Sequence, residues 1–352
     1  MRSLKDNFSH GGNVYEVERK LGKGVVDFSA NINPFGIPSA AKKILRTKID
    51  SLIHYPDPDA YNLKKALARY WNVRQENILV GNGSTELIYL IMSAFNPSSV
   101  AIPVPSFSEY ERAAGNLKTK IKFIPLEEKQ GFKLNATLAG NSDVIFLCNP
   151  NNPTGNLILE KRADIKKLSN RLIVMDESFM DFLPDERKYT LIKEAQKSKK
   201  IIVLRTLTKF FALAGLRVGY LAAHKSNIDF LKKYQAPWSV NVLAQKAGER
   251  VLSDKAYIDK TKKFMDEERE YLYTRISNIR GLSPFISTAN YILIKIEDEE
   301  LASFTLKGRL LKKGILIRDC SNFRGLDRRF IRVAVRSRRE NLKLVKTLEK
   351  VL

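Results

Sequence analysis

Cysteine is scarce in this sequence of 352 residues. Only Cys148 and Cys320 occur, too few and too far apart in the chain to suggest a disulfide framework or a zinc site. The first residues also lack the apolar core of a secretory signal peptide. Because both absences argue against secretion, we expect a protein of the reducing cytoplasm.

Long apolar runs are missing as well. The one long uncharged stretch, from Leu87 to Phe107, is interrupted by Pro97, Pro103 and Pro105. Each piece is too short to cross a bilayer, which takes about 20 consecutive apolar residues. The sequence also contains no repeat, no low-complexity tract and no flexible linker. We therefore expect no membrane anchor.

Acidic residues are outnumbered by basic ones. The chain has 61 lysines and arginines against 38 aspartates and glutamates, a formal net charge of +23. Such an excess raises the possibility of binding to nucleic acid or to an acidic membrane. The basic residues are spread along the chain, however, and no nucleic-acid motif accompanies them. A solvated basic surface is the better interpretation, with no nucleic-acid or membrane partner, and its field would attract a phosphorylated substrate.

The pattern of the chain predicts an α/β fold. A length of 352 residues suggests roughly two domains. Apolar runs bounded by Gly, Pro, Asn or Asp alternate with helical patterns, which is typical of a mainly parallel sheet. The predicted strands contain residues 78–80, 100–102, 144–147, 172–175 and 201–204. Ligands are expected at the ends of these strands.

Beyond Ser239 the pattern changes. A charged amphipathic stretch predicts a long helix that reaches about Ile279. Shorter elements follow, with strands at 291–294, 315–317 and 330–335 and helices at 302–313 and from about 339. We therefore predict a large, mainly parallel sheet domain over residues 46–258 and a smaller α+β domain over 259–352. An N-terminal arm, residues 1–45, is expected to contribute to the small domain.

One lysine is distinguished by its neighbours. Lys209 follows the predicted strand at 201–204 and is close in sequence to Thr206, Thr208 and Arg217. A lysine held off solvent near another cation has a lowered pKa, so its free amine can condense with an aldehyde to form a Schiff base. The hydroxyls and the arginine suit a phosphate. Pyridoxal 5'-phosphate carries both an aldehyde and a phosphate, and its sites need a lysine and a partner for the pyridinium nitrogen.

Four further segments supply suitable groups. Ser84 and Thr85 open a predicted helix after a glycine-rich turn, where backbone N–H groups can hold a phosphate. Asn152 belongs to a rigid Asn-Pro-Asn-Asn-Pro-Thr-Gly turn, and Asp176 ends a predicted strand, where a buried carboxylate needs a partner. Phe107 follows a proline-rich turn and could stack on a flat ring. Taken singly, each also fits a plain connection, a cap, a salt bridge or the core.

Together these residues resemble the fold-type I pyridoxal-phosphate enzymes, in the branch that includes histidinol-phosphate aminotransferase. The resemblance rests on Asn-Pro-Thr-Gly at 152–155, then Asp176, then Lys209 with Arg217 eight residues on, and it extends over nearly the whole chain. It implies a PLP-dependent transferase-like fold and a homodimer. Tyr55, in Tyr-Pro-Asp-Pro, is similar to the tyrosine that reaches the cofactor phosphate of the neighbouring subunit.

The resemblance implies a role for each residue. Lys209 would be the Schiff-base lysine and Asp176 the partner of the pyridinium nitrogen. Asn152 would hydrogen-bond the ring hydroxyl, and Phe107 would stack on the ring. The cofactor phosphate would be held by Ser84, Thr85, Thr206, Thr208, Arg217 and, from the other chain, Tyr55. Phe179 departs from many aminotransferases, which carry a tyrosine three residues after this aspartate.

Three other segments narrow the resemblance to the L-threonine O-3-phosphate decarboxylases of cobalamin biosynthesis. They are His-Gly-Gly-Asn at 10–13, the stretch 27–34 and the stretch 318–326. The residues implied to bind the phosphorylated amino-acid substrate are His10, Asn13, Asn33, Asn152, Arg318 and Arg332. The first three would supply donors on flexible turns that close over the substrate phosphate. The two arginines would hold the carboxylate, Arg332 through a bidentate fork.

The implied reaction converts L-threonine O-3-phosphate to (R)-1-amino-2-propanol O-2-phosphate and carbon dioxide. The bond that breaks is the one held perpendicular to the cofactor ring, which is C–carboxylate in a decarboxylase and C–H in an aminotransferase. Lys209 is the expected donor of the returning proton. Two alternatives remain at this stage: an aminotransferase acting on histidinol phosphate or another amino acid, and a non-catalytic basic protein that binds nucleic acid or another partner.

Overall fold

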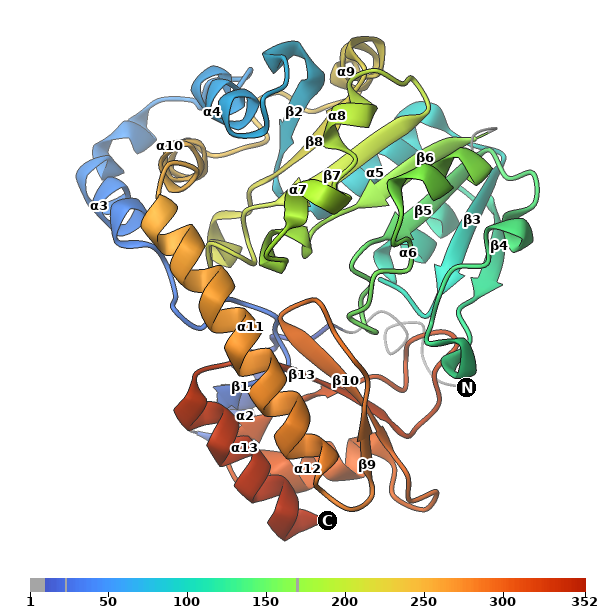
Figure 1. Cartoon of the computed structure of the whole chain (residues 1–352). Helices are drawn as coiled ribbons and strands as arrows, with labels where there is room; N and C mark the ends of the chain where they lie inside the picture. The colour runs from blue at the N-terminus through green and yellow to red at the C-terminus, as the bar shows by residue number, and fades with distance from the viewer. Residues whose placement is uncertain (1–9, 23, 169–170) are drawn as a thin grey trace.

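The computed structural model describes residues 10–22, 24–168 and 171–352. It has two lobes, and a long helix, α11 (Lys255–Ser277), runs from one to the other (Figure 1). One lobe is built on a seven-stranded sheet and the other on a four-stranded sheet. The first nine residues of the expected N-terminal arm lie outside the described residues. The domain boundaries expected at residues 45 and 258 stay a prediction.

The seven-stranded sheet has the order β2-β8-β7-β6-β5-β3-β4. Its strands are β2 (Ile78–Gly81), β3 (Ser99–Val104), β4 (Lys120–Pro125), β5 (Val144–Cys148), β6 (Leu172–Asp176), β7 (Ile201–Thr206) and β8 (Gly219–Ala223). Neighbours pair in parallel except β8, which is antiparallel to β2 and β7. The mainly parallel sheet and its five predicted strands are confirmed. The strands β4 and β8 were not predicted, and in the edge strand β4 the residues Lys120 and Lys122 interrupt the apolar pattern.

Helices cover both faces of this sheet because its central strands are apolar on both sides. In β5, Ile145 and Leu147 belong to one core layer, and Val144, Phe146 and Cys148 belong to the other. The first layer includes side chains of α4 (Tyr61–Trp71), α8 (Ile192–Ala195), α10 (Val242–Val251) and α3 (Ser39–Thr47). The second includes side chains of α5 (Gly83–Phe95), α6 (Glu109–Asn116) and α9 (Lys225–Lys232). The short helix α7 (Glu186–Tyr189) precedes α8.

The four-stranded sheet is antiparallel, with the order β12-β13-β10-β9. Its strands are β9 (Leu282–Pro284), β10 (Tyr291–Ile296), β12 (Arg318–Asp319) and β13 (Phe330–Ala334), and its helices are α12 (Ser303–Lys312) and α13 (Arg338–Val351). Near the start of the chain, α2 (Val14–Leu21) precedes β1 (Val26–Asp27), which pairs in parallel with β11 (Ile315–Leu316). The strand β1 therefore lies against the smaller lobe.

The single long helix predicted from Ser239 to Ile279 is wrong, because two helices, α10 and α11, occupy this stretch. At the break, the Asp254 side chain accepts a hydrogen bond from the backbone N–H of Tyr257 at 3.1 Å. Such a cap satisfies one of the free N–H groups at a helix start, so it favours a new helix here. The amphipathic pattern continues through both helices and did not reveal the break.

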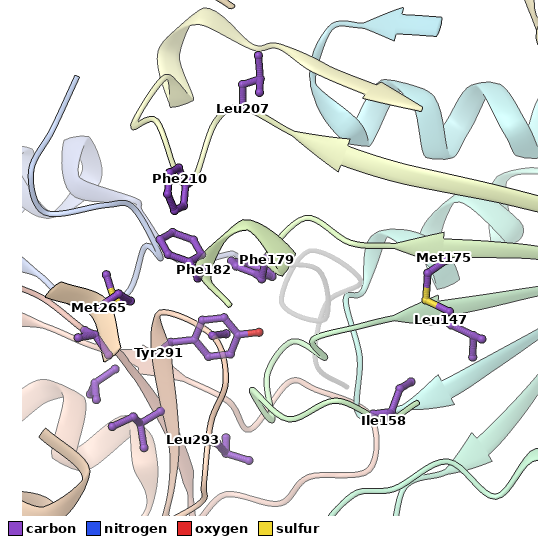
Figure 2. Packing of buried hydrophobic residues seen from close by; sticks show 14 of the residues in the cluster. Leu147, Ile158, Met175, Phe179, Phe182, Leu207, Phe210, Met265, Tyr291 and Leu293 are labelled. Carbon is purple, nitrogen blue, oxygen red and sulfur yellow. The ribbon is translucent and has the colours of Figure 1, made fainter. Parts of the chain in front are cut away.

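The two lobes share one apolar core, which Figure 2 shows in part. Met265 of α11 and Tyr291 of β10 belong to the same buried cluster as Phe179 and Phe210. The rings of Phe179 and Tyr291 meet edge to face, with centroids 4.9 Å apart. Burying a side chain of this size contributes about 1.5–3 kcal/mol. The small lobe is therefore packed directly against the segments that follow β6 and β7.

Two absences concern the described residues only. None of their helices is both long enough and apolar enough to cross a membrane. No three of their His, Cys, Asp or Glu side chains are grouped so as to hold a metal ion. Both cysteines are buried and unpaired.

Candidate active site

Lys209 lies just after β7, in the loop that leads to β8. Its backbone carbonyl accepts a hydrogen bond from the backbone N–H of Asn33 at 3.1 Å. The pKa of Lys209 is lowered from 10.5 to about 8, chiefly by burial and then by the positive charges of Arg332 and Arg217, while the negative charge of Asp176 opposes the shift. A lowered pKa leaves more free amine near neutral pH, which an amine that attacks an aldehyde requires.

Lys209 lines a cavity at the carboxyl ends of β5, β6 and β7. Nine of the residues predicted to hold a cofactor line it together: Ser84, Thr85, Phe107, Asn152, Asp176, Thr206, Thr208, Lys209 and Arg217. Cys148, Ser178 and Phe179 also line it. These residues follow different strands and are far apart in the sequence. The fold therefore brings the nine predicted cofactor-binding residues together. Open α/β sheets bind ligands at this edge.

One end of the cavity suits an anion. The helix α5 begins at Gly83, and the free N–H groups of a helix start attract negative charge. A Cβ atom added to Gly83 would lie only 2.4 Å from Nη2 of Arg217, so only glycine lets the guanidinium approach the helix start this closely. The hydroxyl oxygens of Thr206 and Thr208 lie 2.7 Å apart at the end of β7. N–H groups, guanidinium and hydroxyls together fit a phosphate.

Asp176 ends β6 and is buried. Its Oδ2 accepts a hydrogen bond from the Tyr110 hydroxyl at 2.6 Å, and its Oδ1 accepts one from the backbone N–H of Ser178 at 2.9 Å. A carboxylate held by two donors suits a positively charged ring nitrogen as a further partner. Sequence reasoning missed Tyr110. Its only signal was the spacing of three residues, about one helical turn, from Phe107.

Arg332 reaches this region from the small lobe. It lies in β13, is buried, and donates hydrogen bonds to Oδ1 of Asn152 and, at 2.9 Å, to the backbone carbonyl of Ser29. Arg318 is its register partner on β12 and donates to Oδ1 of Asn322 at 2.7 Å. Burial lowers the pKa of both arginines. The contact between Arg332 and Asn152 joins the small lobe to the turn after β5.

The chain is similar to known proteins over nearly its whole length. Residues 23–348 match the model of a family described as aminotransferase class I and II. The chain belongs to this family. The fold predicted by resemblance, that of the fold-type I enzymes, is thereby confirmed, as is the α/β architecture.

Three relatives show where the chain lies among the class I and II aminotransferases. It is 40% identical to threonine-phosphate decarboxylase from Salmonella typhimurium over 98% of this chain and 97% of that protein. The solved histidinol-phosphate aminotransferase from Clostridium acetobutylicum is 31% identical, with a TM-score of 0.86 over 93% of this chain and 99% of that one. The solved L-threonine-O-3-phosphate decarboxylase from Porphyromonas gingivalis is 29% identical, with a TM-score of 0.83 over the same shares.

Two residues predicted to bind substrate lie near the start of the described chain. Nε2 of His10 is 2.7 Å from Oε1 of Glu109, and the His10 ring centroid is 5.4 Å from that of Phe107. His10 therefore lies beside a residue that lines the cavity of this aminotransferase-family protein. Asn13 is exposed, its side chain bonds Glu16 at the start of α2, and it is not among the lining residues.

Asn33 begins a turn, since its backbone carbonyl accepts a hydrogen bond from the N–H of Gly36 at 3.1 Å, but its side chain is held inside the protein. Its side-chain amide donates to the backbone carbonyl of Phe210 at 2.8 Å and to Oγ1 of Thr261 at 3.0 Å, and it is buried. Because these bonds occupy the amide, Asn33 anchors the Lys209 loop to α11. Asn31, in the same segment, was not singled out, yet its buried Oδ1 has no hydrogen-bond partner among the residues described.

Tyr55 is the one predicted cofactor residue outside the cavity. Its side chain is 81% exposed, and its ring lies 5.0 Å from that of Trp238. The role that the family resemblance implies for it needs a second subunit, so one chain alone does not test it.

Proposed function

We propose that this protein is a pyridoxal 5'-phosphate-dependent decarboxylase. It converts L-threonine O-3-phosphate to (R)-1-amino-2-propanol O-2-phosphate and carbon dioxide, in the synthesis of cobalamin. The observation that carries the proposal is the cavity in which Lys209 and Asp176 lie together with groups that fit a phosphate, among them Ser84, Thr85 and Arg217. The choice of substrate is supported by the near full-length similarity to a threonine-phosphate decarboxylase.

The cavity residues fit this cofactor. The cofactor phosphate would be held by Ser84, Thr85, Thr206, Thr208 and Arg217, which line the same cavity as Lys209. Asp176 would hold the ring nitrogen, Asn152 the ring hydroxyl and Phe107 the ring face. When bound, the cofactor supplies an electron sink for the bond that breaks at the α carbon.

The remaining work falls to the protein's own side chains. Arg332 and Arg318 carry the charges that would hold the substrate carboxylate, and both are buried, so their attraction to an anion is weakly screened. By fixing the carboxylate, the two arginines would present the C–carboxylate bond, rather than C–H, to the electron sink that the cofactor supplies. His10 would hold the substrate phosphate. Since the pKa of Lys209 is about 8, its Nζ can hold and release a proton near neutral pH and so return one to the α carbon.

We further propose a cytoplasmic homodimer, in which Tyr55 reaches the cofactor phosphate of the neighbouring subunit. In support, Tyr55 and Ile53 are each 81% exposed and Trp238 is 49% exposed. Exposed apolar side chains of this size that gather in one region mark interaction surfaces. Sedimentation equilibrium would test the state of association, and a protein that stays monomeric at micromolar concentration would contradict the dimer.

The deciding experiment supplies the cofactor-loaded protein with L-threonine O-3-phosphate and no 2-oxo acid. Catalytic release of carbon dioxide and aminopropanol phosphate together is expected. Lys209→Ala should lose both turnover and the absorbance of lysine-bound cofactor. Absence of release from the unaltered protein, followed by amino transfer once histidinol phosphate and 2-oxoglutarate are added, would replace the decarboxylase with an aminotransferase.

A further inference from the structure

Tyr110 is a buried tyrosine of α6 that contacts two of the residues around the cofactor cavity. Its hydroxyl donates to Oδ2 of Asp176 at 2.6 Å. Its ring stands edge-on to Phe107, with centroids 5.7 Å apart. It also stacks on Phe146 of β5, with centroids 4.9 Å apart and planes 10° from parallel. These ring contacts fix where the hydroxyl points.

The hydroxyl of Tyr110 acts as a donor toward Asp176. Burial raises the pKa of Tyr110 well above its ordinary value of 10, and the negative charge of Asp176 adds to the effect. The phenol therefore stays protonated over the working pH range. The backbone N–H of Ser178 donates to Oδ1 of Asp176, so both oxygens of this carboxylate accept a hydrogen bond and its orientation is fixed.

We propose that Tyr110 is a positioning residue for the cofactor, acting through Asp176. By donating to this carboxylate, it fixes the orientation of Oδ1 and Oδ2 and keeps Asp176 from taking the proton of the cofactor ring nitrogen. The positive charge thus kept on the ring strengthens its pull on electrons. The inference rests on the cofactor of the proposed function and not on its substrate.

The first test is Tyr110→Phe, which removes the hydroxyl and keeps the ring. The Tyr110–Asp176 hydrogen bond already exists without the cofactor, so only its contribution to holding Asp176 in place is lost on binding, and the dissociation constant for pyridoxal 5'-phosphate should rise several-fold. In the cofactor-loaded protein, the visible absorbance changes with pH as the imine nitrogen that joins the cofactor to Lys209 gains or loses a proton. The pH midpoint of this change should also rise, because a less positive ring favours the protonated form of that nitrogen. Neither readout requires substrate.

The matched control is Tyr220→Phe. Tyr220 is a buried tyrosine of β8 whose hydroxyl accepts a hydrogen bond from the Trp71 indole at 2.6 Å. Its loss should lower the melting temperature while leaving the cofactor affinity and the absorbance midpoint unchanged. A Tyr110→Phe protein that behaves like this control would reduce Tyr110 to a structural role and overturn the inference.

A second variant covers the case in which Tyr110→Phe does not fold. Incorporation of 3-fluorotyrosine at position 110 keeps the shape and the hydrogen bond but makes the phenol more acidic and so a stronger donor. The absorbance midpoint should then move down, opposite to the phenylalanine variant. An unmoved midpoint would overturn the inference alone. Failure of the unaltered protein to bind pyridoxal 5'-phosphate would overturn the proposed function with it.

Discussion

The amine of Lys209 should react with acylating reagents at a much lower pH than an ordinary lysine. Its pKa of about 8, against an ordinary 10.5, means that about half of the amine is free at pH 8. An amine with the ordinary value is only about 0.3% free at that pH, so the difference is about 160-fold. Burial is the largest cause, followed by the charges of Arg332 and Arg217.

Competitive acetylation of the cofactor-free protein measures this directly. Trace acetic anhydride is applied briefly between pH 6 and 11, and the extent of labelling of each lysine is read by peptide mass spectrometry. Lys255, exposed at the start of α11, serves as the internal reference. Normalising each lysine to its own plateau separates the pH midpoint from accessibility. A midpoint for Lys209 at or above that of Lys255 would refute the reasoning.

The same assay separates burial from charge. Arg332→Gln removes one of the two cations that lower the pKa of Lys209. The midpoint should rise because a positive neighbour disfavours the protonated amine. It should remain below 10.5, since burial is the largest cause and persists in the variant. A midpoint that does not move would show that Arg332 contributes no charge effect at Lys209.

Three further predictions concern binding. Gly83→Ala and Gly314→Ala each place a side chain at positive φ and should each cost roughly 1–2 kcal/mol of stability, but only the first, whose Cβ meets Arg217, should weaken cofactor binding in an equilibrium titration. Arg332→Lys loses the bidentate fork and should raise the substrate KM about ten- to a hundredfold with a smaller change in kcat, and unchanged saturation kinetics would count against its carboxylate role. Glu109→Gln removes the carboxylate beside His10 and should raise the KM for the phosphorylated substrate, with cofactor affinity retained; an unaltered KM would remove His10 from the substrate site.

Much of the candidate site follows from the sequence because the carboxyl ends of neighbouring parallel strands meet at one edge. Ser84, Asn152, Asp176 and Lys209 each follow a strand that the apolar runs predicted, so their meeting in one cavity required only the correct sheet. The local motifs and the family resemblance then indicated which part of the cofactor each residue would contact.

The remainder depends on contacts that no local pattern encodes. Tyr110 meets Asp176 across 66 positions of sequence and Arg332 meets Asn152 across 180, through the packing of separate elements. Asn33 lies in a polar stretch that predicts a turn, yet its side-chain amide already donates hydrogen bonds to the backbone carbonyl of Phe210 and to Oγ1 of Thr261. The sequence shows which side chains can donate hydrogen bonds, but it does not show which of them already bond to other parts of the protein.

The proposed site draws its residues from both sheets, and the two contributions are coupled. The residues proposed to hold the cofactor come from the seven-stranded sheet and its loops, whereas Arg332 and Arg318, proposed to hold the substrate carboxylate, come from the four-stranded one. Because Arg332 also lowers the pKa of Lys209 and donates a hydrogen bond to Asn152, a substitution at this one position of the smaller lobe would alter the proposed substrate contact and the amine proposed to hold the cofactor at the same time.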